Sequence, residues 1–235
     1  MKIAVITARG GSKRVPRKNV KFFCGKPMIA WSIETARTSG LFDHVIVSTD
    51  DSEIADIARQ FGADVPFIRP PDLATDTAGT TEVMAHATRW AQGNFTTLEA
   101  VCCIYATAPF LQAVDLLRGW EAMRTGHWHF TFSVTEYASS IFRSLKLGSD
   151  FAVEMLFPEH FLTRSQELPE TFHDCGQFYW GRPQAWVGMA RIFDHHSKAI
   201  IIPRWRVQDI DTLEDWHQAE LMKQVMLLRQ KTSAA

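Results

Sequence analysis

The residues best suited to chemistry lie between positions 8 and 19, directly after a short apolar segment. This stretch holds two adjacent glycines and five cationic side chains: Arg9, Gly10, Gly11, Lys13, Arg14, Arg17 and Lys18. Glycine has no Cβ, so backbone N–H groups can approach a bound anion, while lysine and arginine supply the opposite charge. The pattern favours a polyphosphate ligand. A solvated basic loop is the alternative, and the rest of the chain has to decide between the two.

Two common phosphate-binding patterns are absent from the sequence. It contains neither G-x-x-x-x-G-K-[ST], the P-loop, nor G-x-G-x-x-G, the dinucleotide fingerprint, which argues against an ATPase and a dehydrogenase. The basic loop suits the synthesis of a sugar nucleotide instead. In that chemistry Arg9 and Lys18 would hold a triphosphate and offset negative charge in the transition state, and Gly10 and Gly11 would let the backbone approach.

A pair of carboxylates near the C-terminus, Asp209 and Asp211, forms a second candidate site. We predict that the pair ends a short strand. Alternate strand residues point to the same side, so both carboxylates could reach one divalent cation. For an isolated D-x-D pair, a helix cap beside a surface acid is the simpler interpretation, but a polyphosphate loop in the same chain favours the metal.

Strands that alternate with helices must position these groups. Apolar segments predict strands at 3–7, 44–48, 65–68, 100–105 and 130–134, and helical patterns cover 27–39, the segment from Asp51 to Gly62, 80–90 and 114–123. This alternation predicts an α/β fold with a Rossmann-like, doubly wound, mostly parallel sheet. Such sheets bind ligands beyond the carboxyl ends of their strands. The basic loop, Asp50 and Thr107 each follow a strand and should share one rim.

The alternation stops in the third quarter of the chain. Residues 138–183 are rich in Phe, Glu, Arg and His with weak periodicity, and we predict an insertion subdomain there, whose Phe-rich segments could form a dimer surface. The pattern returns with strands at 199–203 and 209–211, and Thr212 should cap a final helix that ends near Arg229. The predicted domains are therefore 1–137 with 184–235, and 138–183.

Composition sets wider bounds. A chain of 235 residues that is 46% hydrophobic can bury a proper core, and a net charge of −1 argues against general nucleic-acid binding. No apolar run approaches the ~20 residues of a membrane span, and the N-terminus lacks a signal-peptide pattern. Four cysteines without C-x-x-C spacing favour reduced thiols over zinc or disulfides. We therefore expect a cytoplasmic protein without membrane or nucleic-acid partners.

Four motifs, in order, resemble the cytidylyltransferases that activate nine-carbon 2-keto sugar acids, the family that contains CMP-sialic acid synthetase. They are the CTP-binding segment 8–19, the second-strand motif Val47-Ser48-Thr49-Asp50-Asp51, the segment from Arg69-Pro70 to Asp76-Thr77 that closes over the cytosine, and Gln208-Asp209-Ile210-Asp211-Thr212. Any one of them could arise by chance, whereas four in order are specific. The resemblance covers nearly the whole chain.

The resemblance implies the fold of nucleotide-diphospho-sugar transferases, with CTP and a nine-carbon 2-keto sugar acid as substrates and Mg²⁺ as cofactor. It implies catalytic roles for Arg9, Lys18 and Asp211, and metal binding by Asp209 and Asp211. The nucleotide contacts it implies are Ala8, Arg9, Gly10, Gly11, Lys13, Asn19, Arg69 and Thr80, with cytosine near Arg69 and Thr80 and ribose near Asn19. The sugar contacts it implies are Tyr105, Arg143, Arg164, Gln166, Gln177 and Tyr179. In this family the insertion also swaps across a dimer and completes the neighbour's sugar site, which implies a homodimer.

Departures from the family pattern indicate the sugar. Sialic acid synthetases carry Gln-Pro-Thr-Ser-Pro where this chain has Tyr105-Ala106-Thr107-Ala108-Pro109. Further on, Arg164-Ser165-Gln166 and the run from His173 to Trp180 replace their Asn-Gly-x-Ile-Tyr. These departures resemble the branch that acts on pseudaminic acid, a sugar that usually decorates flagellin or surface polysaccharide. The same chemistry on sialic, legionaminic or 3-deoxy-octulosonic acid is the alternative. A nucleotide-binding domain that has lost catalysis is a third interpretation, against which the cations and both aspartates argue.

Overall fold

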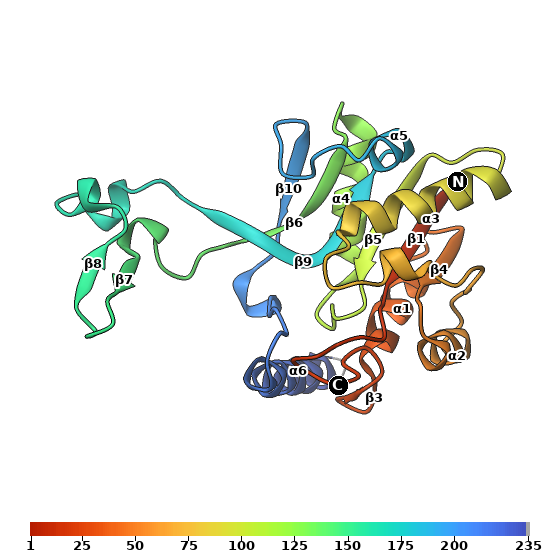
Figure 1. The fold of residues 1–235 in the computed structure, drawn as a ribbon, viewed down its shortest axis with the longest axis horizontal. Helices are drawn as coiled ribbons and strands as arrows, with labels where there is room; N and C mark the ends of the chain where they lie inside the picture. Colours follow the sequence, from red (N-terminus) through yellow and green to blue (C-terminus); the bar gives the residue numbers. More distant parts are fainter. Residues whose placement is uncertain (234–235) are drawn as a thin grey trace.

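A central sheet of six strands, in the order β10-β6-β9-β5-β1-β4, organises the computed structural model, which describes residues 1–233 (Figure 1). Its strands are β1 (Lys2–Thr7), β4 (His44–Ser48), β5 (Ala100–Tyr105), β6 (Phe130–Glu136), β9 (Phe172–Gly181) and β10 (Ser197–Ile201). Neighbouring strands pair in parallel except at β9, which is antiparallel to both β5 and β6. The predicted mostly parallel sheet is confirmed.

Helices cover both faces of this sheet. They are α1 (Met28–Thr38), α2 (Ser52–Gln60), α3 (Thr80–Asn94), α4 (Ala113–Thr125), α5 (Pro183–Val187) and α6 (Leu213–Ser233). Alternate residues of β1 separate the two cores: Ala4 and Ile6 pack with α1, α2 and α4, whereas Ile3 and Val5 pack with α3 and α5. A strand that is buried on both faces has to be apolar throughout, which explains why β1 and β5 lack a polar alternation. The doubly wound architecture is therefore confirmed.

The remaining elements are short. They are the strands β2 (Phe22–Phe23), β3 (Lys26–Pro27), β7 (Leu145–Leu147) and β8 (Val153–Met155), and the 3₁₀ turns Pro71–Leu73, Ile141–Arg143, Pro158–His160, Ser165–Glu167 and Arg204–Arg206. Strands β2 and β3 pair as a hairpin between the basic loop and α1. Within the described residues, no helix has the length and apolar character that crossing a membrane requires.

Two predicted strands are wrong. Segment 65–68 makes only isolated parallel bridges, with Thr49 pairing Ile68 and Ile46 pairing the preceding Asp64, and Pro66 has no N–H to donate to a ladder. Segment 209–211 is a loop, because its backbone bonds to a side chain instead of to a strand. The N–H of Asp211 donates to the Asp215 carboxylate.

The predicted insertion is shorter in the structure than 138–183. Residues 172–181 form β9, which returns into the middle of the sheet between β5 and β6. Only residues 137–171, which we call the arm, project from the body and end in the β7–β8 hairpin (Figure 1). Strand β9 is buried at both faces over its second half and is kinked at Gly176 (φ +60°), so it shows no alternation in the sequence. Residues 234 and 235 of the predicted second domain segment lie outside the described residues.

Candidate active site

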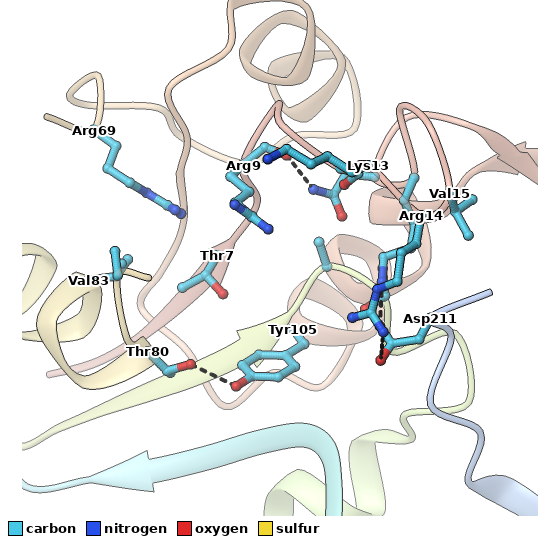
Figure 2. A pocket seen from close by; sticks show the side chains of 16 residues that line it. Thr7, Arg9, Lys13, Arg14, Val15, Arg69, Thr80, Val83, Tyr105 and Asp211 are labelled. Atoms are coloured by element: carbon cyan, nitrogen blue, oxygen red, sulfur yellow. Dashed lines mark hydrogen bonds and ion pairs between the residues drawn. The ribbon is translucent and has the colours of Figure 1, made fainter. Parts of the chain in front are cut away.

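A cleft of about 280 Å³ opens at the carboxyl edge of β1 and β5, where the sheet topology predicts a ligand (Figure 2). Its walls are Thr7, Arg9, Ser12, Lys13, Arg14, Val15, Lys18, Asn19, Arg69, Ala78, Thr80, Val83, Tyr105, Ala106, Thr107 and Asp211. Eight predicted site residues therefore meet here: Arg9, Lys13, Lys18, Asn19, Arg69, Thr80, Tyr105 and Asp211. They come from segments far apart in the sequence, which the parallel strands bring to one rim.

The glycine loop is fastened to the start of α2. The N–H of Gly10 donates to Asp50 (3.0 Å), and a Cβ at this position would lie 2.6 Å from an oxygen of Asp51. Asp51 in turn caps α2 by accepting from the N–H of Ile54 (3.0 Å), as predicted for the Asp50–Asp51 pair. Arg17 bonds the Asp51 carboxylate (2.5 Å) and lowers its pKa. Only glycine fits at position 10, because the loop lies directly against this cap.

Two cations of the loop converge on one anionic group. Arg9 and Lys13 each form an ion pair of 2.5 Å with Asp76, one to each carboxylate oxygen. These hydrogen bonds, Lys13 first and Arg9 second, lower the pKa of Asp76. The two side chains can therefore bind different oxygens of one anionic group, which is the arrangement that a phosphate needs.

The aspartate motif lies across the cleft from β1. Asp211 pairs with Arg14 (2.9 Å) and Lys18 (3.6 Å), and Lys18 also donates to the carbonyl of Ile210 (2.5 Å). Asp209 lies on the same loop but does not line the cleft. Its pKa is raised by burial and then by the negative charge of Asp211. Lys18 thus connects the basic loop to the aspartate motif.

Asp215 shapes the loop that carries the two aspartates. Its carboxylate accepts from the N–H groups of Asp211 (3.1 Å) and Thr212 (2.8 Å), and the Thr212 hydroxyl accepts from the N–H of Asp215 (3.1 Å). This reciprocal arrangement is a capping box at the start of α6, so the predicted cap at Thr212 is confirmed. The same bonds hold Asp211 in place beside the cleft.

A buried ion pair anchors the segment that leads into this loop. Arg206 bonds Asp115 of α4 through two nitrogens (2.5 and 3.1 Å), and both side chains are almost inaccessible to water. The carbonyl of Arg206 accepts from the Gln177 amide (2.8 Å). Gln177, predicted as a sugar contact, is buried in β9 and serves here to hold the aspartate segment from below.

Replacing Asp115 with alanine should lower the free energy of unfolding by about 3–5 kcal/mol, because it leaves the Arg206 guanidinium buried without its partner. Urea unfolding followed by circular dichroism measures the change. Asp56→Ala is the matched control, since Asp56 forms its one ion pair among the described residues with Arg59 at the exposed surface of α2. An equally small loss in both variants would show that the buried pair does not anchor the fold.

Arg69, Thr80 and Tyr105 line the part of the cleft away from the basic loop (Figure 2). Arg69 is buried and bonds Ser48 through its Nε (3.1 Å, to the hydroxyl) and one Nη (2.5 Å, to the carbonyl). Burial lowers its pKa. The Thr80 hydroxyl is hydrogen-bonded to the Tyr105 hydroxyl (2.7 Å). This region offers a planar cation and neutral hydroxyls, a set that suits a nucleobase or a sugar better than a phosphate.

The other predicted sugar contacts do not line this cleft. Tyr179 lies behind Tyr105, with ring centroids 5.4 Å apart. Arg143 is half-buried in the arm and donates to the carbonyls of Phe161 (3.0 Å) and Thr163. Arg164 and Gln166 are exposed on the arm, and within the described residues no ion pair engages Arg164. Arg143, Arg164 and Gln166 therefore lie on the arm, apart from the cleft of their own chain.

The contacts of three carboxylates that matter to the geometry were not predicted from the sequence. Asp76, Asp115 and Asp215 each hold a candidate site group in place. The site partners of Asp76 and Asp115 are at least 63 positions away, and those of Asp215 belong to a turn. In the sequence each of them is simply an aspartate, and aspartates are equally common in exposed loops that hold nothing in place. Arg14 was recognised as part of the charge cluster, but its pairing with Asp211 joins segments at opposite ends of the chain.

Comparisons with known proteins agree with this geometry. The family model described as cytidylyltransferase matches residues 3–179. A curated pseudaminic acid cytidylyltransferase of Campylobacter jejuni is 41% identical over 223 residues, which cover 95% of this chain and 96% of that protein. An N-acylneuraminate cytidylyltransferase of Escherichia coli is 29% identical over 94% of this chain and 52% of that protein. A solved CMP:2-keto-3-deoxy-manno-octonic acid synthetase complexed with CTP shares the fold, with a TM-score of 0.71, 16% identity and coverage of 95% and 98%.

Proposed function

The chain belongs to the cytidylyltransferase family, and on that premise we propose that it transfers CMP from CTP to the anomeric hydroxyl of pseudaminic acid, giving CMP-pseudaminic acid and pyrophosphate. The observation that carries the proposal is the cleft itself, in which Arg9, Lys13 and Lys18 meet opposite Asp211. The 41% identity to a pseudaminic acid cytidylyltransferase extends over nearly the full length of both chains, which supports this sugar over the sialic, legionaminic and octulosonic acids.

The reaction needs in-line attack at the α-phosphorus. The triphosphate would lie along the basic loop with the ribose near Asn19 and the cytosine against Arg69 and Thr80. The sugar's 2-hydroxyl oxygen would form the new bond to the α-phosphorus while the bond from that phosphorus to the bridging β-phosphate oxygen breaks. Pyrophosphate then leaves, and the hydroxyl proton passes to water. Arg9, Lys13 and Lys18 would offset the negative charge that grows on the departing pyrophosphate.

The aspartate motif fits a divalent cation, which we propose to be Mg²⁺. Mg²⁺ is usually held by one or two carboxylates together with substrate phosphates and water, and Asp209 and Asp211 offer that donor set. The repulsion between the two carboxylates, which contributes to the raised pKa of Asp209, is what a cation would relieve. When bound, the ion would polarise the α-phosphate and lower the pKa of the attacking hydroxyl.

The arm supports a homodimer in which it completes the partner's sugar site. It carries apolar side chains that face solvent in the single chain: Leu145, Leu147, Phe151, Val153, Phe161 and Leu162, with Phe151 81% and Leu162 89% exposed. Several large apolar side chains exposed on one short segment favour an interaction site there. Covering it with a second copy would bring Arg143 and Arg164 to a neighbouring cleft, where Arg164 is suited to bind the sugar carboxylate through two hydrogen bonds.

We place the enzyme in the cytoplasm. All four cysteines, Cys24, Cys102, Cys103 and Cys175, are free thiols, and three of them are buried. Burial raises the pKa of Cys103 and of Cys175, each to about 12, so these thiols stay protonated. Such thiols suit a reducing compartment.

Pyrophosphate release with CTP, Mg²⁺ and a panel of sugar acids tests the proposal. We expect release with pseudaminic acid and little with sialic, legionaminic or 3-deoxy-octulosonic acid. Release with one of the other acids instead would keep the chemistry and overturn the sugar. Binding of CTP without release from any acid would indicate a nucleotide-binding domain that has lost catalysis.

A further inference from the structure

The carboxylate of Asp76 binds two of the cations that the proposed reaction assigns to phosphate. Arg9 donates through Nη1 to one of its oxygens and Lys13 donates through Nζ to the other, each at 2.5 Å. Both cations line the cleft, whereas Asp76 does not and lies on the exposed segment before α3. The carboxylate therefore binds these cations from outside the cleft wall.

This contact resembles the one that a bound phosphate would make. A carboxylate and a phosphate both present two neighbouring oxygens, which is why the same cationic side chains recognise both groups. Arg9 and Lys13 repel each other when their charges are brought this close, so an anion has to lie between them. Asp76 supplies that anion from within the chain, and a phosphate can supply it instead.

A phosphate on the same two cations has to contend with Asp76. Bonded to Arg9 and Lys13, it would lie close to the Asp76 carboxylate, and like charges at such a distance repel. The ion pairs are weak enough to exchange, because the side chains of Arg9, Lys13 and Asp76 are 35%, 80% and 48% exposed and surface pairs contribute little. Within the described residues, no other ion pair holds the Asp76 carboxylate.

We propose that Asp76 is an internal competitor for Arg9 and Lys13, which phosphates displace when they bind and which returns to both cations when pyrophosphate leaves. This inference rests on the proposed function, in which pyrophosphate is a product. Competition for the two cations weakens the binding of pyrophosphate and so favours its release after transfer. CTP is still retained, because the proposed base and ribose contacts do not involve Asp76.

Calorimetric binding of inorganic pyrophosphate to the wild-type protein and to Asp76→Asn tests this. Asparagine keeps the size of the side chain and removes its charge. We expect the Kd for pyrophosphate to fall about 3- to 10-fold in Asp76→Asn, because two exposed ion pairs no longer compete. Asp76→Glu, which keeps the charge, should stay near the wild-type value. In a Lys13→Ala background the gain from Asp76→Asn should be smaller, because one of the two contested cations is gone.

Asp56→Asn is the matched control, since it removes another exposed, ion-paired aspartate, on α2 and outside the cleft. It should leave the Kd for pyrophosphate unchanged. An equal gain in Asp56→Asn would reveal a general effect of net charge and would overturn the proposal. If Asp76→Asn does not fold, Asp76→Ser removes the same charge and takes its place in the comparison.

Unchanged or weaker pyrophosphate binding in folded Asp76→Asn would also overturn the proposal, and weaker binding would show that the carboxylate positions the cations for phosphate. Pyrophosphate that binds neither protein would overturn it as well. The measurement needs neither CTP nor a sugar acid, so it is separate from the reaction. Tighter binding in Asp76→Asn without CMP transfer by the wild type would refute the reaction and keep the competition, whereas transfer with unchanged pyrophosphate binding would do the reverse.

Discussion

Replacing Asp211 with alanine is expected to lower the turnover number by about 10³-fold, the largest effect we predict for a single residue. The change removes a carboxylate oxygen that the proposed cation requires, and loss of a metal-centred charge interaction of this kind is worth several kcal/mol in the transition state. It also frees Arg14 and Lys18 from their partner. Steady-state kcat from pyrophosphate release, at saturating CTP and sugar, measures the effect.

The fold should survive this substitution. Asp211 is partly exposed and its ion pairs are near the surface, where each contributes at most about 1 kcal/mol. Thermal unfolding of Asp211→Ala should therefore resemble that of Asp56→Ala, an exposed control far from the cleft. Near-normal turnover in a folded Asp211→Ala protein would contradict the metal assignment. The two aspartates would then have only a structural role, in the loop that precedes α6.

Replacing Arg164 with alanine is expected to raise the KM for the sugar acid about 10- to 100-fold while the KM for CTP stays near its normal value. The side chain projects from the arm and is proposed to bind the sugar carboxylate, and hydrogen bonds to a charged group are worth about 1.5–3 kcal/mol. Initial rates with each substrate varied in turn separate the two constants. An equal rise in both would show that Arg164 does not bind the sugar.

A mixing experiment tests whether the arm acts on the partner's cleft. Asp211→Ala inactivates a cleft, and Arg164→Ala inactivates an arm. If the arm serves the neighbour, a mixed dimer contains one intact cleft that receives an intact arm, and mixing the two variants should restore activity at low sugar concentration. If the arm serves its own cleft, every mixed dimer stays impaired. No recovery, with subunit exchange confirmed by mass spectrometry, would contradict a shared site.

Hydrophobic patterns predicted every parallel strand of the sheet. Strands β1, β4 and β5 are short apolar runs, as expected for parallel strands buried on both faces. Strand β6 stands out instead because Phe130, Phe132 and Val134 alternate with polar residues, and β10 because it ends in an isoleucine run. The same patterns predicted that the basic loop and Thr107 share a rim. The role of each site residue was then inferred from resemblance to a family, because periodicity alone predicts secondary structure and not function.

The misplaced elements have physical causes. Strand β9 was assigned to the insertion because its kink at Gly176 breaks the alternation and its aromatic residues resemble those of an interface. The segment 209–211 has the composition of a strand end, yet the Asp215 carboxylate competes for its backbone N–H groups. The pairs of Asp76 with Arg9 and of Asp115 with Arg206 join distant segments, and such tertiary contacts leave no local pattern.

The position of β9 has a consequence for biosynthesis. Strands β5 and β6 are not neighbours in the sheet, because β9 lies between them, and β9 is made only after the whole arm. A nascent chain that ends within the arm can assemble β4-β1-β5, but it leaves the edges of β5 and β6 unpaired and open to association with other chains. Strands β5 and β6 can therefore be joined through β9 only after residue 181 has left the ribosome. At that moment the arm becomes a loop whose two ends are held by the adjacent strands β6 and β9.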